Sequence, residues 1–512
     1  MNDKLIVIQG ARGRFFCMMK KETVMNKDKS LPLSNMRIAI TSVDLEQAEH
    51  RGIAYLSKSL IRSLSQQGAQ VYLLTGFHGR RLNPFMKFMM NDISVNEVDC
   101  ADILDQLSDS KIPQKINLKT IDQKSNYLED IIQKIISLKL KSNQIISLIL
   151  PILKFYLRGA LFYGRLIELK DIETSPYWGE ERIDYLKYVN GFLAIPDIYL
   201  LSTLRSRRIL FKSPQIDLRK HNIDFLITTC PLSLNVKCKQ KESLKILQII
   251  MDFIPLSFSK HPDHPYSFYN RLKDSMQSKC CFISQNSRNK ICKLLNKSVN
   301  KYQDSIMYPI PSLNSANLML ANHLSIVRGI DYKFILFNSS VVPRKNLHFL
   351  IQAFQSSGIA TRGIKLCVAG KIHNDNYGER IKEICEDDSS INLLGYVNEI
   401  EKSWLFLNAH AFASPSCVEG FGIPVLDAYI LGLNVLASNI PSHKEIGEMI
   451  TIDGNLKLLD LNNIDSWIAA LSEIVDDEVC SDFKNKRLAN FDLSIKHLQS
   501  SFDQKLFKLI TQ

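Results

Sequence analysis

The sequence lacks the cysteine spacings that mark a disulfide framework or a zinc site. Its 512 residues include eleven cysteines, an odd number, with no C-x-x-C pair and one adjacent pair, Cys280–Cys281. A disulfide scaffold or a zinc cage needs closer and more regular spacing. The cysteines are therefore expected to be buried, reduced thiols, as is usual for proteins of the cytoplasm.

Long apolar runs are also missing. The longest candidate, Ser142–Leu153, is interrupted by Pro151, whereas a membrane-spanning helix needs about 20 apolar residues. No transmembrane helix is predicted. Residues 1–35 contain one short apolar run, Leu5–Ile8, which is too short for the core of a signal peptide. We expect residues 1–35 to be a disordered extension, or to follow from a start codon placed too far upstream.

Motifs of metal hydrolases and of ATP-binding loops are absent as well. The sequence has no H-E-x-x-H, no G-x-x-x-x-G-K-[ST] and no internal repeat. Metal catalysis, ATP hydrolysis and a bound cofactor are therefore not expected.

The composition is that of an ordinary globular protein with a basic balance. Hydrophobic residues make up 45% and charged residues 23%, and the net charge is +12. At about 150 residues per domain the length predicts two to four domains. The positive charge favours an anionic partner, which is a nucleic acid, a membrane surface or a phosphorylated substrate.

Strands and helices alternate along the C-terminal half. Strands are expected at Lys333–Asn338, Lys365–Ala369, Ile391–Leu394, Ala411–Ser414 and Asn434–Ser438. Helices are expected after Asn346 as N-cap, near Glu379–Cys385, around Glu399–Leu407, at Pro424–Leu431 and from Pro441. This alternation predicts a parallel sheet covered on both faces, which is a doubly wound α/β domain.

A second alternating unit begins at Met36. Its expected elements are strand Met36–Thr41, helix Ile53–Ser65, strand Gln70–Leu74, and later strands Phe225–Thr229, Ile246–Met251 and Cys281–Ser284. Residues 100–200 between them show weak strand signals and are expected to be a helical insertion. Within it, residues 115–170 carry ten basic and four acidic side chains, which indicates contact with an anionic membrane or an ordinary insertion packed on its own domain.

These signals give four predicted segments. Residues 1–35 precede the fold, residues 36–315 form an N-terminal domain, and residues 326–490 form a C-terminal domain. The hinge is expected at Pro309–Ser325. Residues 491–512 are expected to form a C-terminal helix that crosses back to the N-terminal domain.

The strongest chemical signal is the segment Ser414–Asp427. A strand ends at Ser414, a loop with Gly420 and Gly422 follows, and a helix begins near Pro424. Glycines let backbone N–H groups approach a ligand, and a helix N-terminus favours an anion. The carboxylates of Glu419 and Asp427 suit sugar hydroxyl groups. The pattern fits a nucleotide sugar; an ordinary tight turn with a surface Glu and Asp is the alternative.

A basic turn is the second signal. Arg344 and Lys345 precede a helix, where cations are not otherwise favoured. Fixed cations at this place would stabilise the negative charge that grows on a departing diphosphate. An exposed basic turn is the alternative interpretation.

Weaker signals lie at the ends of other expected strands. Gly52 follows the first strand, and Asp252 lies in the segment Ile250–Pro255, at the carboxyl end of the strand Ile246–Met251. Gly370 and Tyr396 end two strands of the C-terminal sheet. Turn or cap chemistry explains each of them equally well.

The segment Glu419–Ala428 resembles the Glu-x7-Glu signature of retaining glycosyltransferases of family 4, with Asp427 in place of the second Glu. This family has two facing Rossmann-like domains, the GT-B fold. The turn Val342–Leu347 is similar to the family's "G-R/T-x-x-P-R-K-N", although Asn338 and Ser339 replace its Gly and Arg. The resemblance covers residues 333–450 well and the N-terminal half in patches.

The resemblance implies roles for single residues. Glu419 would contact the donor sugar, Asp427 the nucleotide ribose, and Lys345, helped by Arg344, the donor phosphates. Asp252 lies in a stretch similar to "I-H-D-L-I-P", with Met251 in place of His. Further donor contacts are implied for Gly52, Gly370, Tyr396, Gly420, Phe421, Gly422 and Ile423, and Lys345, Glu419 and Asp252 are the candidate catalytic residues.

The expected protein is therefore a cytoplasmic transferase without a metal. It would move a mannose- or rhamnose-type sugar from a nucleotide diphosphate sugar to a glycan or lipid-linked acceptor with retention, in polysaccharide or glycoconjugate synthesis. The acceptor would bind the N-terminal domain. The protein would lie in the cytoplasm or peripherally at the inner face of a membrane, and nucleic acid is not an expected partner. The alternatives are a nucleotide-sugar 2-epimerase on the same fold and a degenerate, non-catalytic binding scaffold, for which Ser339, Met251 and Asp427 are the supporting departures.

Overall fold

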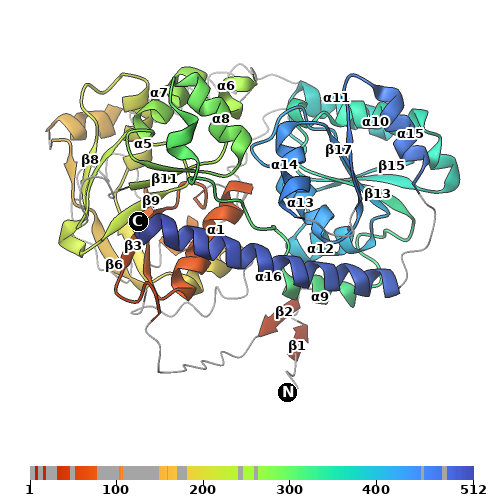
Figure 1. The fold of residues 1–512 in the computed structure, drawn as a ribbon, viewed down its shortest axis with the longest axis horizontal. Coiled ribbons are helices and arrows are strands. Elements are labelled where there is room, and N and C mark those ends of the chain that lie inside the picture. Colours follow the sequence, from red (N-terminus) through yellow and green to blue (C-terminus); the bar gives the residue numbers. More distant parts are fainter. Residues whose placement is uncertain are drawn as a thin grey trace, which may run out of the picture. The chain divides into compact units, whose positions relative to one another are not determined.

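The fold consists of two compact units, each with its own sheet of mainly parallel strands (Figure 1). One unit comprises residues 1–249 and 265–280, and the other comprises residues 250–264 and 281–512. The computed structural model describes residues 6–9, 15–18, 31–46, 52–77, 103–104, 106–107, 149–157, 159–169, 182–239, 246–258, 263–450, 455–474 and 481–511.

The first unit is built on a sheet with the strand order β12-β11-β9-β3-β4-β7-β6, in which β12 (Lys279–Phe282) is an edge strand. The other strands are β3 (Arg37–Thr41), β4 (Gln70–Thr75), β6 (Arg165–Glu168), β7 (Gly191–Ala194), β9 (Phe225–Thr228) and β11 (Ile246–Ile250). All neighbouring pairs among them are parallel except β6 with β7. The buried runs of β3, β4 and β9 are typical of strands covered on both faces.

Helices and short elements complete the first unit. They are α1 (Gly52–Gln66), η3 (Asp184–Tyr188), α5 (Ile198–Ser206), η4 (Arg219–His221) and α7 (Pro265–Ser275). A small parallel sheet has the order β10-β8-β5, from Asn235–Lys237, Gln215–Asp217 and Leu161–Phe162. Two further strands, β1 (Ile6–Gln9) and β2 (Phe15–Met18), pair antiparallel. They lie within residues 1–35, which the sequence analysis placed before the fold.

The expected helical insertion at residues 100–200 is wrong in its second half. Residues 149–157 are helical, but β6 and β7 are strands of the main sheet. Strand β7 has four residues and begins with a glycine, so its propensity signal is weak. Its burial on both faces comes from the tertiary fold and not from the local sequence. Residues 108–148, which hold much of the basic stretch, lie outside the described part of the chain.

The second unit contains a sheet of six parallel strands in the order β15-β14-β13-β16-β17-β18. The strands are β13 (Phe334–Asn338), β14 (Lys365–Ala369), β15 (Ile391–Gly395), β16 (Ala411–Ser414), β17 (Asn434–Ser438) and β18 (Asn455–Leu459). Strands β13 and β16 are neighbours at the centre of the sheet. From β13 the strands β14 and β15 follow toward one edge, and from β16 the strands β17 and β18 follow toward the other. The predictions for the first five strands are confirmed to within one residue at each end.

Helices cover both faces of this sheet (Figure 1). They are α10 (Leu347–Ser356), α11 (Asn376–Glu386), α12 (Glu399–Asn408), α13 (Ile423–Ile430), α14 (Pro441–Met449) and α15 (Ile464–Ser472). The unit also contains α6 (Ile254–Ser257), α8 (Gln285–Leu294), η6 (Val299–Tyr302), α9 (Ser315–Asn322), η7 (Pro343–Lys345), η8 (Ile359–Arg362) and α16 (Ser481–Thr511). Strand β12 (Lys279–Phe282) spans the boundary between the units in the sequence.

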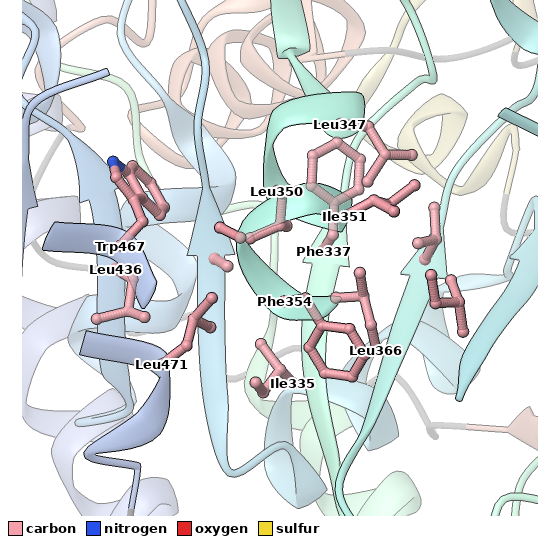
Figure 2. Packing of buried hydrophobic residues seen from close by; sticks show 14 of the residues in the cluster. Ile335, Phe337, Leu347, Leu350, Ile351, Phe354, Leu366, Leu436, Trp467 and Leu471 are labelled. Atoms are coloured by element: carbon pink, nitrogen blue, oxygen red, sulfur yellow. The ribbon is translucent and has the colours of Figure 1, made fainter. Parts of the chain in front are cut away.

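Side-chain alternation along β13 divides the core of the second unit into two layers. Ile335 and Phe337 pack with the α10 residues Leu350 and Phe354 in one cluster (Figure 2). Trp467 of α15 belongs to the same cluster. On the other face, the ring of Phe334 stacks on Trp404 of α12, with centroids 6.1 Å apart. Both layers hold β13 rigidly, and therefore hold the loop that follows it.

Two predicted details differ from the structure. Asn346 occupies the N-cap position of α10, but it is left-handed, with φ 55°, and its side chain makes no cap bond. Its backbone N–H instead donates to Pro343 O and closes η7. Strand β12 ends before Ser284, because the Ser284 side chain caps α8 by accepting from Ser287 N.

The boundaries of the units also differ from the expected hinge, since Pro309–Ser325 lies inside the second unit. The C-terminal helix α16 starts ten residues before the expected 491 and packs against α9, α12 and α13 of the same unit. Its crossing back to the N-terminal domain stays a prediction. No helix in the described residues is long and apolar enough to span a membrane.

Candidate active site

The candidate site lies where the strand order of the second unit reverses. Strands β13 and β16 are neighbours and parallel, so the loops at their carboxyl ends meet at one edge of the sheet. Cys417 N, after β16, donates to Arg344 O, after β13, at 2.8 Å. In open parallel sheets, ligands bind at this reversal point. The two strongest sequence signals are thereby brought together.

The centre of the site is a cluster of three charges, in which Lys345 and Glu419 are buried and Arg344 is half-buried. Lys345 Nζ pairs with Glu419 Oε1, and Arg344 Nη1 lies 3.1 Å from Glu419 Oε2. Lys345 and Glu419 are each 7% exposed. Arg344 also donates to Val418 O at 3.3 Å. Two cations therefore share one carboxylate, which leaves the cluster with an excess of positive charge.

The cations control the ionisation of Glu419. Burial alone would raise the pKa of this carboxyl, but the charges of Lys345 and Arg344 outweigh burial and lower it to about 2. Glu419 is therefore ionised at neutral pH. Burial lowers the pKa of Lys345, and the neighbouring Glu419 opposes that shift. An anionic ligand at this place would stabilise the charged lysine further.

Gly420 and Asp252 lie against each other. A Cβ on Gly420 would come within 2.8 Å of both Asp252 Cβ and Met251 O, so no larger residue fits without a shift. The Gly420 carbonyl accepts from Ser284 Oγ at 2.8 Å. Asp252 is half-buried next to Arg344 and Glu419, and the partial removal of water from its carboxyl raises its pKa. The predicted catalytic residues Lys345, Glu419 and Asp252 thus lie in one place.

The glycine loop ends at the N-terminus of α13. Gly422 is left-handed, with φ 107°, and a Cβ there would lie 3.2 Å from His443 Nε2. His443 is fully buried, and burial lowers its pKa to about 4. Its Nδ1 lies 2.9 Å from Ser438 O, so Nδ1 carries the proton and the neutral ring packs under the loop.

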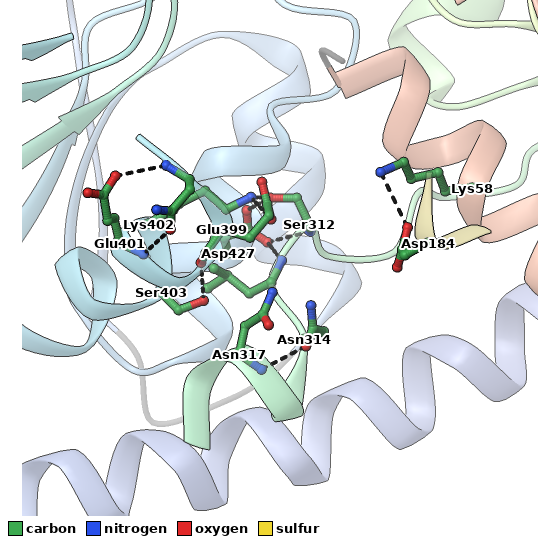
Figure 3. Close-up of polar contacts among 12 residues, drawn as sticks. Lys58, Asp184, Ser312, Asn314, Asn317, Glu399, Glu401, Lys402, Ser403 and Asp427 are labelled. Carbon is green, nitrogen blue, oxygen red and sulfur yellow. Dashed lines mark hydrogen bonds and ion pairs between the residues drawn. The ribbon is translucent and has the colours of Figure 1, made fainter. Parts of the chain in front are cut away.

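Asp427 is held by the segment that precedes α9 (Figure 3). Its carboxylate is fully buried and accepts from Ser312 N at 2.7 Å, Ser312 Oγ at 2.5 Å and Leu313 N at 3.4 Å. Buried Lys402 Nζ lies 3.3 Å from Ser312 Oγ and 2.5 Å from Glu399 Oε2. Burial raises the pKa of Asp427 to about 6. The contact with a ribose stays a prediction, and the observed partners of Asp427 belong to its own unit.

The remaining predicted residues lie around this centre or outside it. Gly370 follows β14, with φ 139°, and a Cβ there would overlap Ser339 O. Tyr396 follows β15 and is 63% exposed, and its carbonyl accepts from Arg328. Phe421 is buried against Tyr308, with ring centroids 5.8 Å apart. Ile423 begins α13. Gly52 begins α1 of the other unit.

A second polar cluster lies at the carboxyl edge of the first unit, where the sequence analysis predicted only Gly52. Asp44 accepts from Ser57 Oγ and from Thr229 Oγ1, the latter at 2.9 Å. Glu46 Oε1 accepts from Ser42 Oγ at 2.6 Å and Thr75 Oγ1 at 2.7 Å.

Burial raises the pKa of Asp44 to about 6 and that of Glu46 to about 7. The signal for this cluster in the sequence was two acidic residues directly after the first buried strand.

The described residues hold no group of three His, Cys, Asp or Glu side chains arranged to bind a metal ion. The expectation that no metal or cofactor is needed stays a prediction.

A comparison with known protein families gives a match within the second unit, which contains the candidate site. Residues 325–490 match the family model described as Glycosyl transferases group 1. O-antigen chain mannosyltransferase B of Escherichia coli is 31% identical over 147 residues, which cover 28% of this chain and 37% of that protein. The serotype-specific mannosyltransferase WbdA of Escherichia coli is 30% identical over 119 residues, 22% of this chain and 14% of that protein. The chain thus spans less than half the length of these curated relatives.

Among solved structures, the crystal structure of TarM superposes with a TM-score of 0.50 at 14% identity, covering 94% of this chain and 100% of that chain. At this identity the likeness shows the fold alone. The predicted fold class, α/β of the GT-B type with two Rossmann-like units, is confirmed.

Proposed function

Residues 325–490 of this chain belong to the glycosyl transferases group 1 family, and on that premise we propose that the protein transfers a hexose from a nucleotide diphosphate sugar to a glycan or lipid-linked acceptor. The observation that carries this proposal is the cluster of half-buried Arg344 with buried Lys345 and Glu419 at the strand reversal of the second unit. The cluster contains two cations, which suit the anionic diphosphate of a nucleotide sugar. It also contains a carboxylate, which suits the hydroxyl groups of the sugar.

Donor binding would redistribute the contacts within this cluster. The diphosphate attracts Arg344 and Lys345, which now share Glu419. Its arrival frees a Glu419 oxygen to accept from a hydroxyl group of the sugar. Backbone N–H groups at the N-terminus of α13 add to the binding of the anion. We place the donor in this site, and Glu419 in contact with the transferred sugar.

The leaving diphosphate gains negative charge as the bond to the sugar breaks. Lys345 is fixed by burial and by its ion pair, so it stabilises that charge without a large reorganisation. The acceptor hydroxyl attacks from the same face as the leaving group, and the anomeric configuration is retained. Asp252 lies beside Gly420, where we place it near the reacting sugar.

A mannose-type donor is the favoured one, because two of the relatives bear the name mannosyltransferase. The acceptor is proposed to bind the first unit. There, Asp44 and Glu46 already accept hydrogen bonds from hydroxyl side chains, and sugar hydroxyls are donors of the same type. Synthesis of a surface polysaccharide in the cytoplasm is the proposed role.

Incubation with UDP- and GDP-sugars tests the proposal. A transferase releases the nucleotide diphosphate and free sugar slowly in the absence of an acceptor. Formation of a new sugar nucleotide would favour the 2-epimerase instead. Tight nucleotide binding without turnover would favour a non-catalytic scaffold.

A further inference from the structure

Glu445 of α14 binds the N-terminus of α8. Its carboxylate accepts hydrogen bonds from Gln285 N at 2.5 Å and from Asn286 N at 3.4 Å, which are the first two N–H groups of that helix. Such groups have no partner within the helix, and the helix dipole favours a negative charge beside them. Glu445 is 5% exposed, so water competes little for the contact. Its side chain therefore fixes the start of α8 on α14.

Ser284, the N-cap residue of α8, joins this helix to the glycine loop at residues 420–422. Its Oγ accepts from Ser287 N at 3.0 Å and donates to Gly420 O at 2.8 Å. The hydroxyl group of Ser287 is a second donor, 3.4 Å from the same carbonyl oxygen. Both serines are fully buried, so water does not replace these bonds when a hydroxyl group is removed. The start of α8 therefore holds the Gly420 carbonyl.

The side chain of Gln285 holds the same loop at a second point. Gln285 Nε2 donates to Tyr308 Oη at 3.1 Å. The ring of Tyr308 in turn lies against the ring of Phe421, with centroids 5.8 Å apart, and Phe421 is 2% exposed. The start of α8 thus fixes both the backbone of the glycine loop, at Gly420, and the side chain of the residue that follows.

The held carbonyl determines the direction of the next N–H group. In a trans peptide, the C=O of one residue and the N–H of the next point in opposite directions. Because Gly420 O faces Ser284, the Phe421 N–H is directed away from α8. Neither Phe421 N nor Gly422 N donates to an acceptor among the described residues, although both residues are buried. Buried N–H groups are almost always paired, so a bound ligand is the expected acceptor.

We propose that Glu445 and Ser284 are positioning residues, which hold the peptide between Gly420 and Phe421 so that the Phe421 N–H binds the diphosphate of the donor. This role rests on the proposed function, because it takes a nucleotide diphosphate sugar as the ligand of the loop. Neither Glu445 nor Ser284 touches the donor. An N–H group that is fixed before binding loses little conformational freedom when the anion arrives. A loop released from α8 therefore binds the diphosphate more weakly.

Calorimetry of the full chain with UDP and with GDP tests this role without any need for turnover. Ser284→Ala removes the closer donor to Gly420 O and is expected to raise the Kd of the nucleotide diphosphate on the order of tenfold. Glu445→Gln keeps one acceptor oxygen for the start of α8 and is expected to raise the Kd by a smaller factor. Ser284→Thr keeps the hydroxyl group and is expected to retain the Kd of the parent protein.

Asn463→Ala is the matched control, because it removes a helix cap of the same kind from the same unit. Asn463 is the N-cap residue of α15, and its side chain accepts from Ser466 N at 3.2 Å. Its unfolding temperature is expected to fall, while its Kd stays that of the parent protein. All titrations are made below the unfolding transition of every variant, so a change in Kd reports the site and not the folded fraction.

An unchanged Kd in folded Ser284→Ala overturns the positioning role, as does an equal rise of the Kd in Asn463→Ala. Where Ser284→Ala does not fold, Glu445→Gln decides the question in the same way. A parent protein that binds neither UDP nor GDP would reject the proposed transferase and this role with it. A parent protein that binds the nucleotide and hydrolyses a donor, beside variants with unchanged Kd, would reject the positioning role alone.

Discussion

The carboxyl edges of the two sheets treat their acidic residues in opposite ways. In the second unit, Glu419 is held by two cations, and its pKa falls to about 2. In the first unit, Asp44 and Glu46 are held by hydroxyl groups, and burial raises their pKa values to about 6 and 7. The topology is similar, since each cluster lies where the order of parallel strands reverses. The chemistry differs because the surrounding donors differ.

This difference indicates a division of work between the units. An edge with surplus cations suits an anionic diphosphate. An edge with carboxyls and hydroxyls but no ion pair at Asp44 or Glu46 among the described contacts suits neutral hydroxyl groups. Substitutions that remove a charge should therefore act strongly at the sheet edge of the second unit. At the sheet edge of the first unit they should act weakly, or only as the pH changes.

The largest effect is expected for Glu419→Gln. Removal of the carboxylate leaves Lys345 buried without its counter-ion. Breaking a buried ion pair from one side costs about 3–5 kcal/mol, so the free energy of unfolding should fall by that amount in denaturant titration. Asp184→Asn is the control, because the Lys58–Asp184 pair, 3.5 Å apart, is partly exposed and should contribute less than about 1 kcal/mol. Equal losses in the two variants would contradict the comparison.

Lys345→Ala should come next and should act on turnover. Charge-assisted hydrogen bonds contribute roughly 1.5–3 kcal/mol, so donor turnover should fall on the order of 10- to 150-fold. Arg344 remains beside Glu419 at 3.1 Å, which limits the loss of stability. Lys382→Ala removes a cation from an exposed pair of the same unit and should leave turnover unchanged. Full turnover in a folded Lys345→Ala protein would assign the diphosphate to another cation.

A smaller effect is expected when the contact between Asp427 and Ser312 is removed by substitution. Both residues belong to the second unit. Asp427→Asn and Ser312→Ala should each lower stability, and the double variant should show a coupling of roughly 0.5–3 kcal/mol. If Asp427 also binds the ribose, Asp427→Asn should weaken nucleotide diphosphate binding more than Ser312→Ala does, in calorimetry. Equal weakening by both variants would show that Asp427 acts through the segment that it holds.

The last prediction is a pH dependence that belongs to the first unit. In the folded protein the pKa values of Asp44 and Glu46 are about 6 and about 7, whereas the ordinary pKa values of these side chains are 3.8 and 4.5. Between about pH 4 and 7 the folded state therefore binds more protons than the unfolded state, so stability falls as pH rises through this window. The Asp44→Asn/Glu46→Gln variant should change its unfolding temperature less than the parent between pH 5 and pH 8. If the unfolding temperature changes by the same amount between pH 5 and pH 8 in the variant and in the parent, these carboxyls ionise normally.

The local pattern of the sequence predicted the second unit well. Strands β14, β16 and β17 have the predicted bounds, because each is a short, continuous apolar run between turn residues. The first unit was less predictable. Strand β7 becomes central only because β4 and β6 pair with it on either side, and four residues carry too little information to show this.

The candidate site also contains residues that could be predicted from the sequence and residues that could not. Arg344, Lys345 and Glu419 could be predicted because their types and spacing form a motif, and the parallel sheet then brings their loops together. The role of Gly420 could not be predicted, since it depends on Met251 and Asp252 lying against it. The Asp44 and Glu46 cluster was missed because its hydroxyl donors come from four separate segments.

The sequence by itself determined which residues carry charge and, in the second unit, which segments become strands and helices, because hydrophobic periodicity and turn residues act over a few positions. The tertiary structure decided what each charge meets. Asp427 stands in a motif for ligand binding, yet its oxygens are occupied by Ser312 and Leu313, more than a hundred positions earlier in the chain. Burial and the nearest donors set the state of a carboxyl group, and only the folded chain brings those donors together.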